Sequence, residues 1–476
     1  MYDVVVIGGG VVGGTILREL TKYTLSVCMV EKESDVCMGQ SKANSGIVHA
    51  GFDAEPNTLK AKFNLLGNTM MRDYAKELGV RYINNGALVV AYAEEERQAL
   101  LDLKNRGEIN GVKGLELLDK QKLIEKEPNI SDSAVGALYA PTSGIVCPYE
   151  LTIASIGNAM DNGAELFTEF NVCDIKKEQS LFCIKAQDGR EIKCKMIVNC
   201  AGYFSGEIAS LAGDDSIKIQ GRKGEYILLD REGSDFVTNT IFACPSKKGK
   251  GVLVSPTTNG NIILGSTATE TPDDRTFTTE MGLQEIQQKV GHMMKNPPMS
   301  LAITSFAGVR AYSHIHDFII EESATVKGLI NCAGIESPGL TSAPAIAKYV
   351  VEDIVSKTLS LEENNNFNGQ REPYYFFERL TIEQKNELIK KEPSYGKIVC
   401  RCERVTEGEI LYAMRVNPKA ISIDAIKRRV RAGMGRCQGG FCQITVAEII
   451  AKELNIPFDE VRKSGKGTQI TVGKSK

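Results

Sequence analysis

A glycine-rich segment near the start of the chain limits the choice of fold more strongly than any other feature. The β-branched run Val4–Ile7 leads directly into Gly8, Gly10 and Gly13, and a helical pattern follows over residues 15–20. Here the first glycine allows a tight turn, the second lets the backbone approach a pyrophosphate, and the third lets the helix pack on the strand. The helix N-terminus offers N–H groups to the anion. The segment therefore predicts an α/β domain that binds a dinucleotide.

The next strand-like run supports this interpretation. Residues 26–30 end on Glu31, where a carboxylate can accept hydrogen bonds from ribose hydroxyls. A glycine turn alone is a weak signal, but a strand, a helix and an acid at the right distance favour a dinucleotide site over a plain turn. The motif does not separate FAD from NAD. Its position and the small and polar run over 39–51, which includes Ser41, Asn44 and Ser45, favour FAD, because such a run can line a flat ring system.

Two later segments have the same strand-and-turn character. Residues 195–202 read as a strand that ends on Ala201 and Gly202, and residues 328–334 read as a strand that turns at Gly334. A helix is expected to start near Gly339, and its N-terminus could stabilise negative charge on a reduced flavin ring.

These three segments, in this order, resemble the glycine-oxidase and D-amino-acid-oxidase superfamily of flavoproteins. Within it they are similar to FAD-dependent glycerol-3-phosphate dehydrogenases and to L-2-hydroxyglutarate dehydrogenases, which share residues 44–46 with His49, 224–226 and 336–341. The resemblance covers about residues 1–355 and implies an FAD domain made from discontinuous segments, with a sheet-based substrate domain inserted between them. We expect the FAD to be bound noncovalently. The cofactor-binding residues that we expect are Gly8, Gly10, Gly13, Glu31, Ser41, Asn44, Ser45, Val172, Ala201, Gly202, Gly334, Gly339, Leu340 and Thr341.

Candidate catalytic residues come from the arginines and the histidines. The resemblance implies that Arg310, after the Ala-Gly turn at 307–308, faces the flavin, and an arginine fork suits a carboxylate or a phosphate equally well. Oxidising a carbon beside a hydroxyl needs a base for the hydroxyl proton and an acceptor for the hydride, which is the flavin. Of the four histidines, His49 is the first candidate for a catalytic or flavin-contacting role.

The remaining cations and histidines carry weaker predictions. Strand alternation would place His314 and His316 on one face close to Arg310, whereas His292 is expected to be structural or exposed. The basic turn over 247–250 is more typical of a solvated surface than of a substrate contact.

Four of the thirteen cysteines gather near the C-terminus, and the other nine are scattered, which is typical of core thiols. Cys400 and Cys402 form one pair, and Cys437 and Cys442 form a second pair after 34 residues. Two tight pairs of thiolates can close on one metal centre, and the glycines around the second pair let backbone N–H groups point at sulfur. Zinc and unligated thiols are the alternatives, but a C-x-C pair is unusual for zinc.

The C-terminal pattern resembles the bacterioferritin-associated ferredoxin type of [2Fe-2S] domain, including a helical stretch over 425–435 between the cysteine pairs. The cations around this stretch do not indicate nucleic acid. We expect them to compensate cluster charge or to form a docking face for a partner, and they are Lys427, Arg428, Arg429, Arg431 and Arg436.

The predicted fold class is therefore α/β, with a Rossmann-like FAD domain, an inserted antiparallel-sheet α+β substrate domain and a small helical [2Fe-2S] domain. A polar run near residues 362–369 suggests a boundary before the third domain. We expect residues 1–75, 145–210 and 305–358 in the FAD domain, 76–144 and 211–304 in the substrate domain, 359–395 in a linker, 396–460 in the [2Fe-2S] domain and 461–476 in a tail.

The charge and the hydropathy of the chain limit the ligands and the cellular location that can be expected. The net charge of −3 gives no electrostatic reason for binding nucleic acid or an acidic membrane, and no apolar run approaches the roughly 20 residues that span a bilayer. The start of the chain lacks the pattern of a signal peptide. We expect a cytoplasmic protein that contacts a membrane surface only through partners.

The resemblance implies a function in which sn-glycerol 3-phosphate is oxidised to dihydroxyacetone phosphate and electrons pass through the [2Fe-2S] cluster to partner oxidoreductase or electron-acceptor subunits. The pocket motifs resemble hydroxyglutarate dehydrogenases at least as much, so L-2-hydroxyglutarate or an amino or imino acid is the alternative small anionic substrate. A further hypothesis, from another functional class, is that the chain is an electron-transfer subunit without its own substrate.

Overall fold

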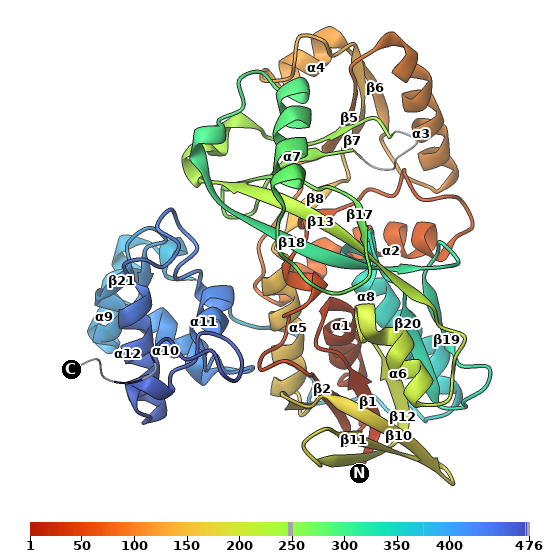
Figure 1. The fold of residues 1–476 in the computed structure, drawn as a ribbon, viewed down its shortest axis with the longest axis vertical. Coiled ribbons are helices and arrows are strands. Elements are labelled where there is room, and N and C mark those ends of the chain that lie inside the picture. Colours follow the sequence, from red (N-terminus) through yellow and green to blue (C-terminus); the bar gives the residue numbers. More distant parts are fainter. Residues whose placement is uncertain (246–250, 375, 472, 474–476) are drawn as a thin grey trace.

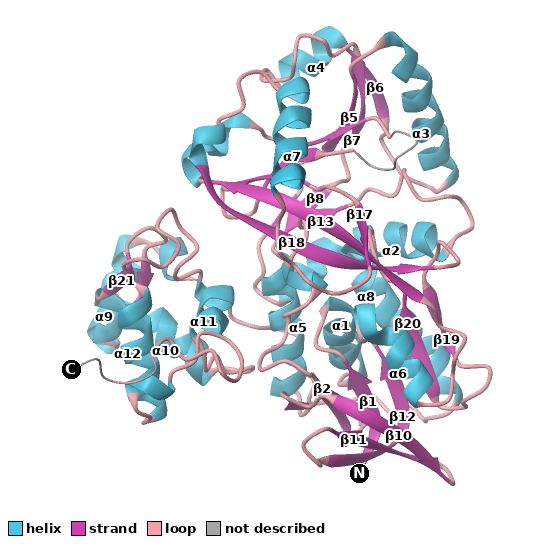
Figure 2. Cartoon of the chain, viewed as in Figure 1, coloured by secondary structure: helices cyan, strands magenta, loops and turns pink. Residues whose placement is uncertain are grey.

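The computed structural model describes residues 1–245, 251–374, 376–471 and 473. Two large sheets lie one beyond the other along the molecule, with helices between and around them, and a third module lies beside the first sheet (Figure 1). The magenta strands of Figure 2 belong mostly to these two sheets, whereas the third module is mainly helical. This arrangement confirms the predicted fold class.

The first sheet is built on buried parallel strands from distant parts of the chain. β1 (Tyr2–Ile7) pairs in parallel with β2 (Val27–Val30) on one side and with β12 (Glu191–Asn199) on the other. Residues 4–7 of β1 are buried, as expected for a strand that is covered on both faces. The other strands of this sheet are β9 (Glu165–Phe167), β10 (Val172–Glu178), β11 (Leu181–Ala186), β19 (Ile319–Glu322) and β20 (Leu329–Ala333).

Helices pack on this sheet and on each other. α1 (Val11–Leu20) follows β1 directly and packs against α5 (Pro148–Asp161) and α8 (Gly339–Tyr349), which in turn packs on α2 (Leu59–Glu77). Apart from one position, α1 is buried along its whole length, so it lies in the interior of this module. α6 (Ser205–Leu211) packs against β20 and β10.

The second sheet joins two segments of the chain that are far apart in sequence. β5 (Ala87–Ala91) pairs in parallel with β14 (Thr240–Ala243), and the other pairings in this sheet are antiparallel. β18 (Ala302–Ser313) pairs along the length of β13 (Ile219–Leu229), so the boundary that we expected at residue 305 falls inside a strand of this sheet. The remaining strands are β6 (Glu116–Asp119), β7 (Gly136–Ala140), β15 (Leu253–Pro256), β16 (Ile262–Gly265) and β17 (Thr269–Thr271).

Short elements complete the body of the molecule. β3 (Ile47–Val48) and β4 (Tyr82–Ile83) pair with β8 (Gly144–Val146) in a small antiparallel sheet. The second sheet carries α3 (Arg97–Ile109), α4 (Lys120–Lys126) and α7 (Glu280–Met293).

The C-terminal module is a small helical unit around a short hairpin. Thr406 caps α10 (Glu407–Arg415) with a reciprocal capping box, in which Glu409 is the partner. The buried apolar side chains of the C-terminal module form one continuous cluster with those of the FAD domain. The elements are α9 (Ile382–Lys391), β21 (Ile398–Cys400), β22 (Val405–Thr406), α10 (Glu407–Arg415), α11 (Ile423–Val430) and α12 (Gln443–Leu454).

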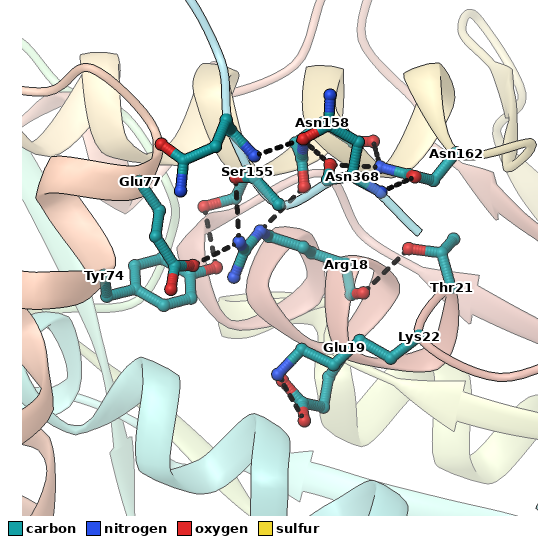
Figure 3. Close-up of polar contacts among 12 residues, drawn as sticks. Arg18, Glu19, Thr21, Lys22, Tyr74, Glu77, Ser155, Asn158, Asn162 and Asn368 are labelled. Atoms are coloured by element: carbon teal, nitrogen blue, oxygen red, sulfur yellow. Dashed lines mark hydrogen bonds and ion pairs between the residues drawn. The ribbon is translucent and has the colours of Figure 1, made fainter. Parts of the chain in front are cut away.

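The segment that precedes this module is fixed to the FAD domain. The buried Arg18 side chain of α1 donates hydrogen bonds to Glu77 at 2.6 Å, to Asn158 at 2.8 Å and to the carbonyl oxygen of Gly369 at 3.2 Å. Figure 3 shows this cluster, in which the carbonyl of Asn368 accepts from Asn158 at 2.9 Å. The polar run near 362–369 therefore packs on α1 and α5 instead of extending into solvent.

Two further contacts continue this attachment toward the third module. Arg371 pairs with Asp161 at the end of α5, with 3.0 Å between nitrogen and oxygen. Asn417 of the third module donates to the other oxygen of the same carboxylate, also at 3.0 Å.

Within the described part of the chain, no helix is both long enough and apolar enough to cross a bilayer.

Candidate functional site

A cavity of about 580 Å³ opens where β1, β2 and β12 end, and β18 of the second sheet closes it from the other side. The carboxyl edge of a parallel sheet is the usual place for a ligand in an α/β protein. The predicted residues that line it are Gly8, Gly10, Glu31, Ser41, Asn44, Ser45, His49, Val172, Ala201, Gly202, Arg310, Gly339 and Leu340.

The glycine turn leaves no room for side chains. Gly8 has a φ of +110°, and a Cβ there would lie 2.4 Å from the carbonyl oxygen of Cys200. A Cβ on Gly13 would lie 2.1 Å from the carbonyl oxygen of Gly8, so Gly13 lets α1 pack on the turn although it does not line the cavity. These positions match the roles that the sequence predicts, and they leave the start of α1 facing the cavity.

Glu31 organises the turn from the end of β2. Its carboxylate accepts hydrogen bonds from the backbone N–H of Gly9 at 2.6 Å and of Glu33 at 2.9 Å. Burial raises the pKa of this carboxyl, and the two backbone hydrogen bonds oppose the rise. A carboxylate held in this way at the cavity wall can accept further hydrogen bonds from ribose hydroxyls, which fits the adenosine half of FAD.

The small and polar run after Glu31 is shaped by its own side chains. Asn44 donates to the carbonyl oxygens of Gln40 at 3.3 Å and Ser41 at 2.9 Å, and its side-chain oxygen accepts from the N–H of Gly46 at 2.9 Å. Ser41 accepts a hydrogen bond of 2.9 Å from the N–H of Val11 at the start of α1. The run is therefore a rigid wall of the cavity beside the helix N-terminus.

Thr341 and Gly334 support the site from behind the cavity wall. The Thr341 hydroxyl accepts from the backbone N–H of His49 at 2.9 Å and donates to the carbonyl of Ile47 at 3.3 Å, so it joins α8 to β3. Gly334 has a φ of +64°, and a Cβ there would lie 2.4 Å from the Cβ of Ser313.

His49 is held at the cavity wall by contacts on both its backbone and its ring. Its Nε2 lies 3.2 Å from the Ser337 hydroxyl, and its ring stacks on Phe242 with 6.0 Å between centroids. Its carbonyl oxygen accepts from Asn64 at 2.7 Å and from Asn68 at 3.1 Å. The imidazole therefore has a defined orientation, as a general base requires.

Arg310 reaches the same cavity from β18. It donates to the Ser266 hydroxyl and to the carbonyl oxygen of Thr267, the latter at 3.2 Å. Gly224 lies beside it on β13, and a Cβ there would come within 2.1 Å of an Arg310 guanidinium nitrogen. Since an arginine carries five donors, these two contacts leave capacity for an anionic substrate.

Sequence reasoning missed several residues of this cavity. Lys32 and Lys42 line it, and so do Tyr226 and Glu336, which lie in the shared motifs at 224–226 and 336–341 but were not predicted as site residues. The lysines carried a usable signal, because one follows Glu31 directly and the other lies inside the small and polar run. Ser266 carried none, because only the pairing of β13 with both β16 and β18 brings it to Arg310.

The other three histidines do not line this cavity. The expectation that His314 and His316 share a strand face is wrong, because β18 ends at Ser313 and both histidines lie in an exposed turn. His292 is exposed on α7, as expected. The basic turn over 247–250 lies outside the described residues.

The four C-terminal cysteines come together as two pairs. The Sγ atoms of Cys402 and Cys437 lie 3.7 Å apart. The Cys442 thiol hydrogen bonds to Cys400, and this contact is the main cause that lowers the pKa of Cys400 to about 6. No three His, Cys, Asp or Glu side chains of the described ranges are grouped so that they could hold one metal ion. A [2Fe-2S] cluster makes a different demand, since it takes four thiolates across two irons.

The backbone around the cysteines fits such a cluster. The N–H groups of Gly433 and Glu403 point at Cys400, and those of Gly439 and Phe441 point at Cys437. Amides aimed at sulfur stabilise thiolates and tune cluster potentials. A Cβ on Gly435 would lie 2.4 Å from the Cβ of Cys402, so this glycine lets the two cysteine loops approach.

The cations around α11 have partners that the sequence could not show. Arg428 and Arg429 are buried and form ion pairs with Asp35 of the FAD domain, and Arg431 pairs with Glu403. The basic stretch is thus largely an internal junction and not a solvent-facing surface.

Comparison with known proteins follows the same division of the chain. Residues 3–353 match the family described as FAD dependent oxidoreductase, and residues 398–452 match the BFD-like [2Fe-2S] binding domain. A glycerol 3-phosphate dehydrogenase of Caloramator mitchellensis is 46% identical over 100% of this chain and 99% of its own length. A mitochondrial L-2-hydroxyglutarate dehydrogenase of Pongo abelii is 33% identical over 56% of this chain and 67% of its own length.

A solved structure of a related flavoprotein has a similar fold. A dithionite-reduced L-alpha-glycerophosphate oxidase of Mycoplasma pneumoniae with FAD bound has a TM-score of 0.74 and 30% identity, covering 78% of this chain and 98% of its own. The FAD cavity and the two cysteine pairs therefore have counterparts in characterised families. The chain belongs to the FAD dependent oxidoreductases, and it carries a [2Fe-2S] binding domain in addition to its FAD domain.

Proposed function

We propose that this enzyme oxidises sn-glycerol 3-phosphate to dihydroxyacetone phosphate and delivers the electrons through its [2Fe-2S] cluster to a separate electron-acceptor protein. The observation that carries this proposal is that His49, which follows β3, and Arg310 of β18 line one cavity with the predicted FAD-binding residues. The full-length similarity to a glycerol 3-phosphate dehydrogenase supports the choice of substrate.

The two side chains have separate tasks in this proposal. Arg310 binds the phosphate, for which a guanidinium fork is well suited. His49 accepts the proton of the substrate's secondary hydroxyl at Nε2, where the substrate takes the place of the Ser337 hydroxyl that lies 3.2 Å from this nitrogen. The stacking of the ring on Phe242 keeps the imidazole in place during this exchange. When bound, FAD supplies a two-electron acceptor and the [2Fe-2S] cluster a one-electron carrier.

The setting that fits these tasks is a reducing one. The cysteines in the described part of the chain are all free thiols, and four of them are needed as thiolates for the cluster. We therefore place the enzyme in the cytoplasm, with any membrane contact made by its acceptor.

A second substrate has a specific observation in its favour. An arginine fork binds a carboxylate as well as a phosphate, and the chain shares 33% identity with an L-2-hydroxyglutarate dehydrogenase over part of its length. L-2-hydroxyglutarate is therefore the alternative substrate to test.

Steady-state kinetics of His49→Gln and Arg310→Lys with glycerol 3-phosphate and an artificial acceptor test the assignment of roles. His49→Gln should lower kcat by about 10²- to 10⁴-fold, which is the usual contribution of a general base. Arg310→Lys should mainly raise KM, because lysine cannot form the fork. His292→Gln, which removes an exposed histidine from α7, should behave as wild type. A His49→Gln enzyme with undiminished kcat would exclude His49 as the base.

A further inference from the structure

The [2Fe-2S] module is attached to the FAD domain by an ion-pair cluster that excludes water. Arg429 of α11 donates to both carboxylate oxygens of Asp35 at 2.9 Å, and Arg428 donates to one of them at 2.6 Å. The side chains of Arg429 and Asp35 are 0% and 8% exposed. A charged pair is seldom buried so deeply unless both partners are held in place by the surrounding fold.

Asp35 lies in the middle of the loop that builds the adenosine side of the FAD cavity. Glu31 and Glu33 before it and Gly39 after it line the cavity. Cys37, two residues after Asp35, donates its backbone N–H to the carbonyl oxygen of Gly9 at 2.9 Å. The loop therefore holds the glycine turn from both sides of Asp35, since Glu31 binds the N–H of the same glycine at 2.6 Å.

Charge from the third module also reaches residues at the cavity wall. Lys42 lines the cavity, and burial together with the nearby charge of Arg428 lowers its pKa. Arg428 is thus close enough to influence a cavity residue as well as Asp35.

The cysteine loops of the third module are attached separately. Arg431 donates to Glu403 at 2.8 Å, to Tyr149 at 3.0 Å and to Asn261 at 3.0 Å, so it joins the first cysteine loop to both other domains. Arg231 of the second domain donates to the carbonyl oxygen of Cys402 itself. The module is therefore fixed in orientation as well as in position.

We propose that Asp35 is a positioning residue that couples FAD binding to the docking of the [2Fe-2S] module, so that each stabilises the other. The proposal adds to the proposed function, which requires the flavin and the cluster to keep one fixed relation. A docked α11 holds the Asp35 loop in its FAD-binding form, and bound FAD holds the same loop in the form that α11 recognises. Coupling between two binding events is reciprocal, so both directions can be measured.

The first experiment is a fluorescence titration of FAD-depleted, cluster-containing protein with FAD, and it needs no substrate. Asp35→Asn keeps the size of the side chain and removes its charge, so the dissociation constant of FAD should rise by about tenfold. Asp188→Asn removes an exposed carboxylate that pairs with Arg190 at 2.8 Å, and it should leave the constant unchanged. Arg428→Met retains the pair between Asp35 and Arg429 and should give a smaller rise than Asp35→Asn.

The second experiment is hydrogen–deuterium exchange of the same proteins with and without FAD. In wild type and Asp188→Asn, FAD should slow exchange in α11, which does not line the cavity; in Asp35→Asn this protection should be lost. Unchanged FAD affinity in Asp35→Asn, with FAD leaving α11 exchange unaltered in wild type, would overturn the proposal. If Asp35→Asn does not fold, Arg428→Met becomes the deciding variant. A dissociation constant of FAD in Arg428→Met equal to that of wild type would then overturn the proposal. Failure of the enzyme to oxidise glycerol 3-phosphate would change neither measurement.

Discussion

Arg429 and Asp35 meet across the junction of two domains in a bidentate ion pair, with both nitrogen–oxygen distances at 2.9 Å. They are 394 residues apart in sequence. Planar, two-point contacts of this kind fix orientation as well as distance. The junction therefore explains how a small helical module can hold one place beside a much larger flavin-binding body.

Breaking this pair should cost stability. Asp35→Asn leaves two buried guanidinium groups without their counter-charge, and removal of one partner from a buried ion pair typically costs about 3–5 kcal/mol. Urea unfolding of the cofactor-loaded protein should show this loss of unfolding free energy. Asp188→Asn should unfold at the same urea concentration as wild type, because its ion pair with Arg190 is on the surface. Equal stability of the two variants would contradict the account of the junction.

The ion pair between Asp35 and Arg429 also predicts how the free energy of unfolding depends on pH. Burial raises the pKa of Asp35, but the charges of Arg429 and Arg428 outweigh this and lower it from its ordinary 3.8 to about 2. Lys42, the Cys37 thiol and the buried Tyr374 hydroxyl are other titratable groups close to this charge cluster. Because the folded pKa is the lower one, the contribution of Asp35 is complete above pH 3.8 and is lost as the pH falls toward about 2.

The measurement is the difference in unfolding free energy between wild type and Asp35→Asn, taken at several pH values. The difference should be constant from neutral pH to about pH 4 and should shrink below it. A difference that already shrinks between pH 7 and pH 5 would mean that another group carries the effect.

Gly224 offers a test of the substrate pocket that does not alter a charged group. In Gly224→Ala the new Cβ would lie 2.1 Å from an Arg310 guanidinium nitrogen, so the guanidinium must move. A displacement of about 1 Å in a positioning group can lower kcat/KM by about a hundredfold. Gly291→Ala, on the exposed side of α7 where a Cβ meets nothing within 4 Å, is the matched control. Normal kinetics in Gly224→Ala would show that the position of Arg310 does not matter.

If the four C-terminal cysteines bind a [2Fe-2S] cluster, replacing one of them should remove the cluster but not the flavin. Cys402→Ser should abolish iron–sulfur absorption after anaerobic reconstitution and leave the flavin spectrum intact, because no described residue of the third module lines the FAD cavity. Cys173→Ser, which changes an exposed thiol outside the third module, should keep both spectra. Stoichiometric zinc and no iron in the wild-type protein would instead favour a zinc site.

Local features of the fold and the FAD site could be predicted from the sequence. The glycines at 8, 10 and 13 and the acid at 31 act through backbone geometry within one strand–turn–helix–strand unit, so their spacing carries the information. The pairing of the cysteines is similar, since Cys400 and Cys402 lie in one short loop and Cys437 and Cys442 in another.

Contacts between distant segments could not be predicted in this way. The sequence predicts that Arg428 and Arg429 compensate cluster charge or form a docking face for a partner, because it does not show that they pair with Asp35 of another domain. Ser266 reaches Arg310 only through the pairing of β13 with both β16 and β18. For His314 and His316, the alternation rule failed because the strand ends one residue before the first of them.

An anaerobic absorbance titration of the purified holoenzyme tests the central claim most directly. Glycerol 3-phosphate is added first and L-2-hydroxyglutarate second, while the flavin and iron–sulfur bands are followed. Bleaching of the flavin by glycerol 3-phosphate, followed by reduction of the cluster within turnover time, is the predicted result. Bleaching by L-2-hydroxyglutarate alone, or by neither compound, would contradict the proposed function.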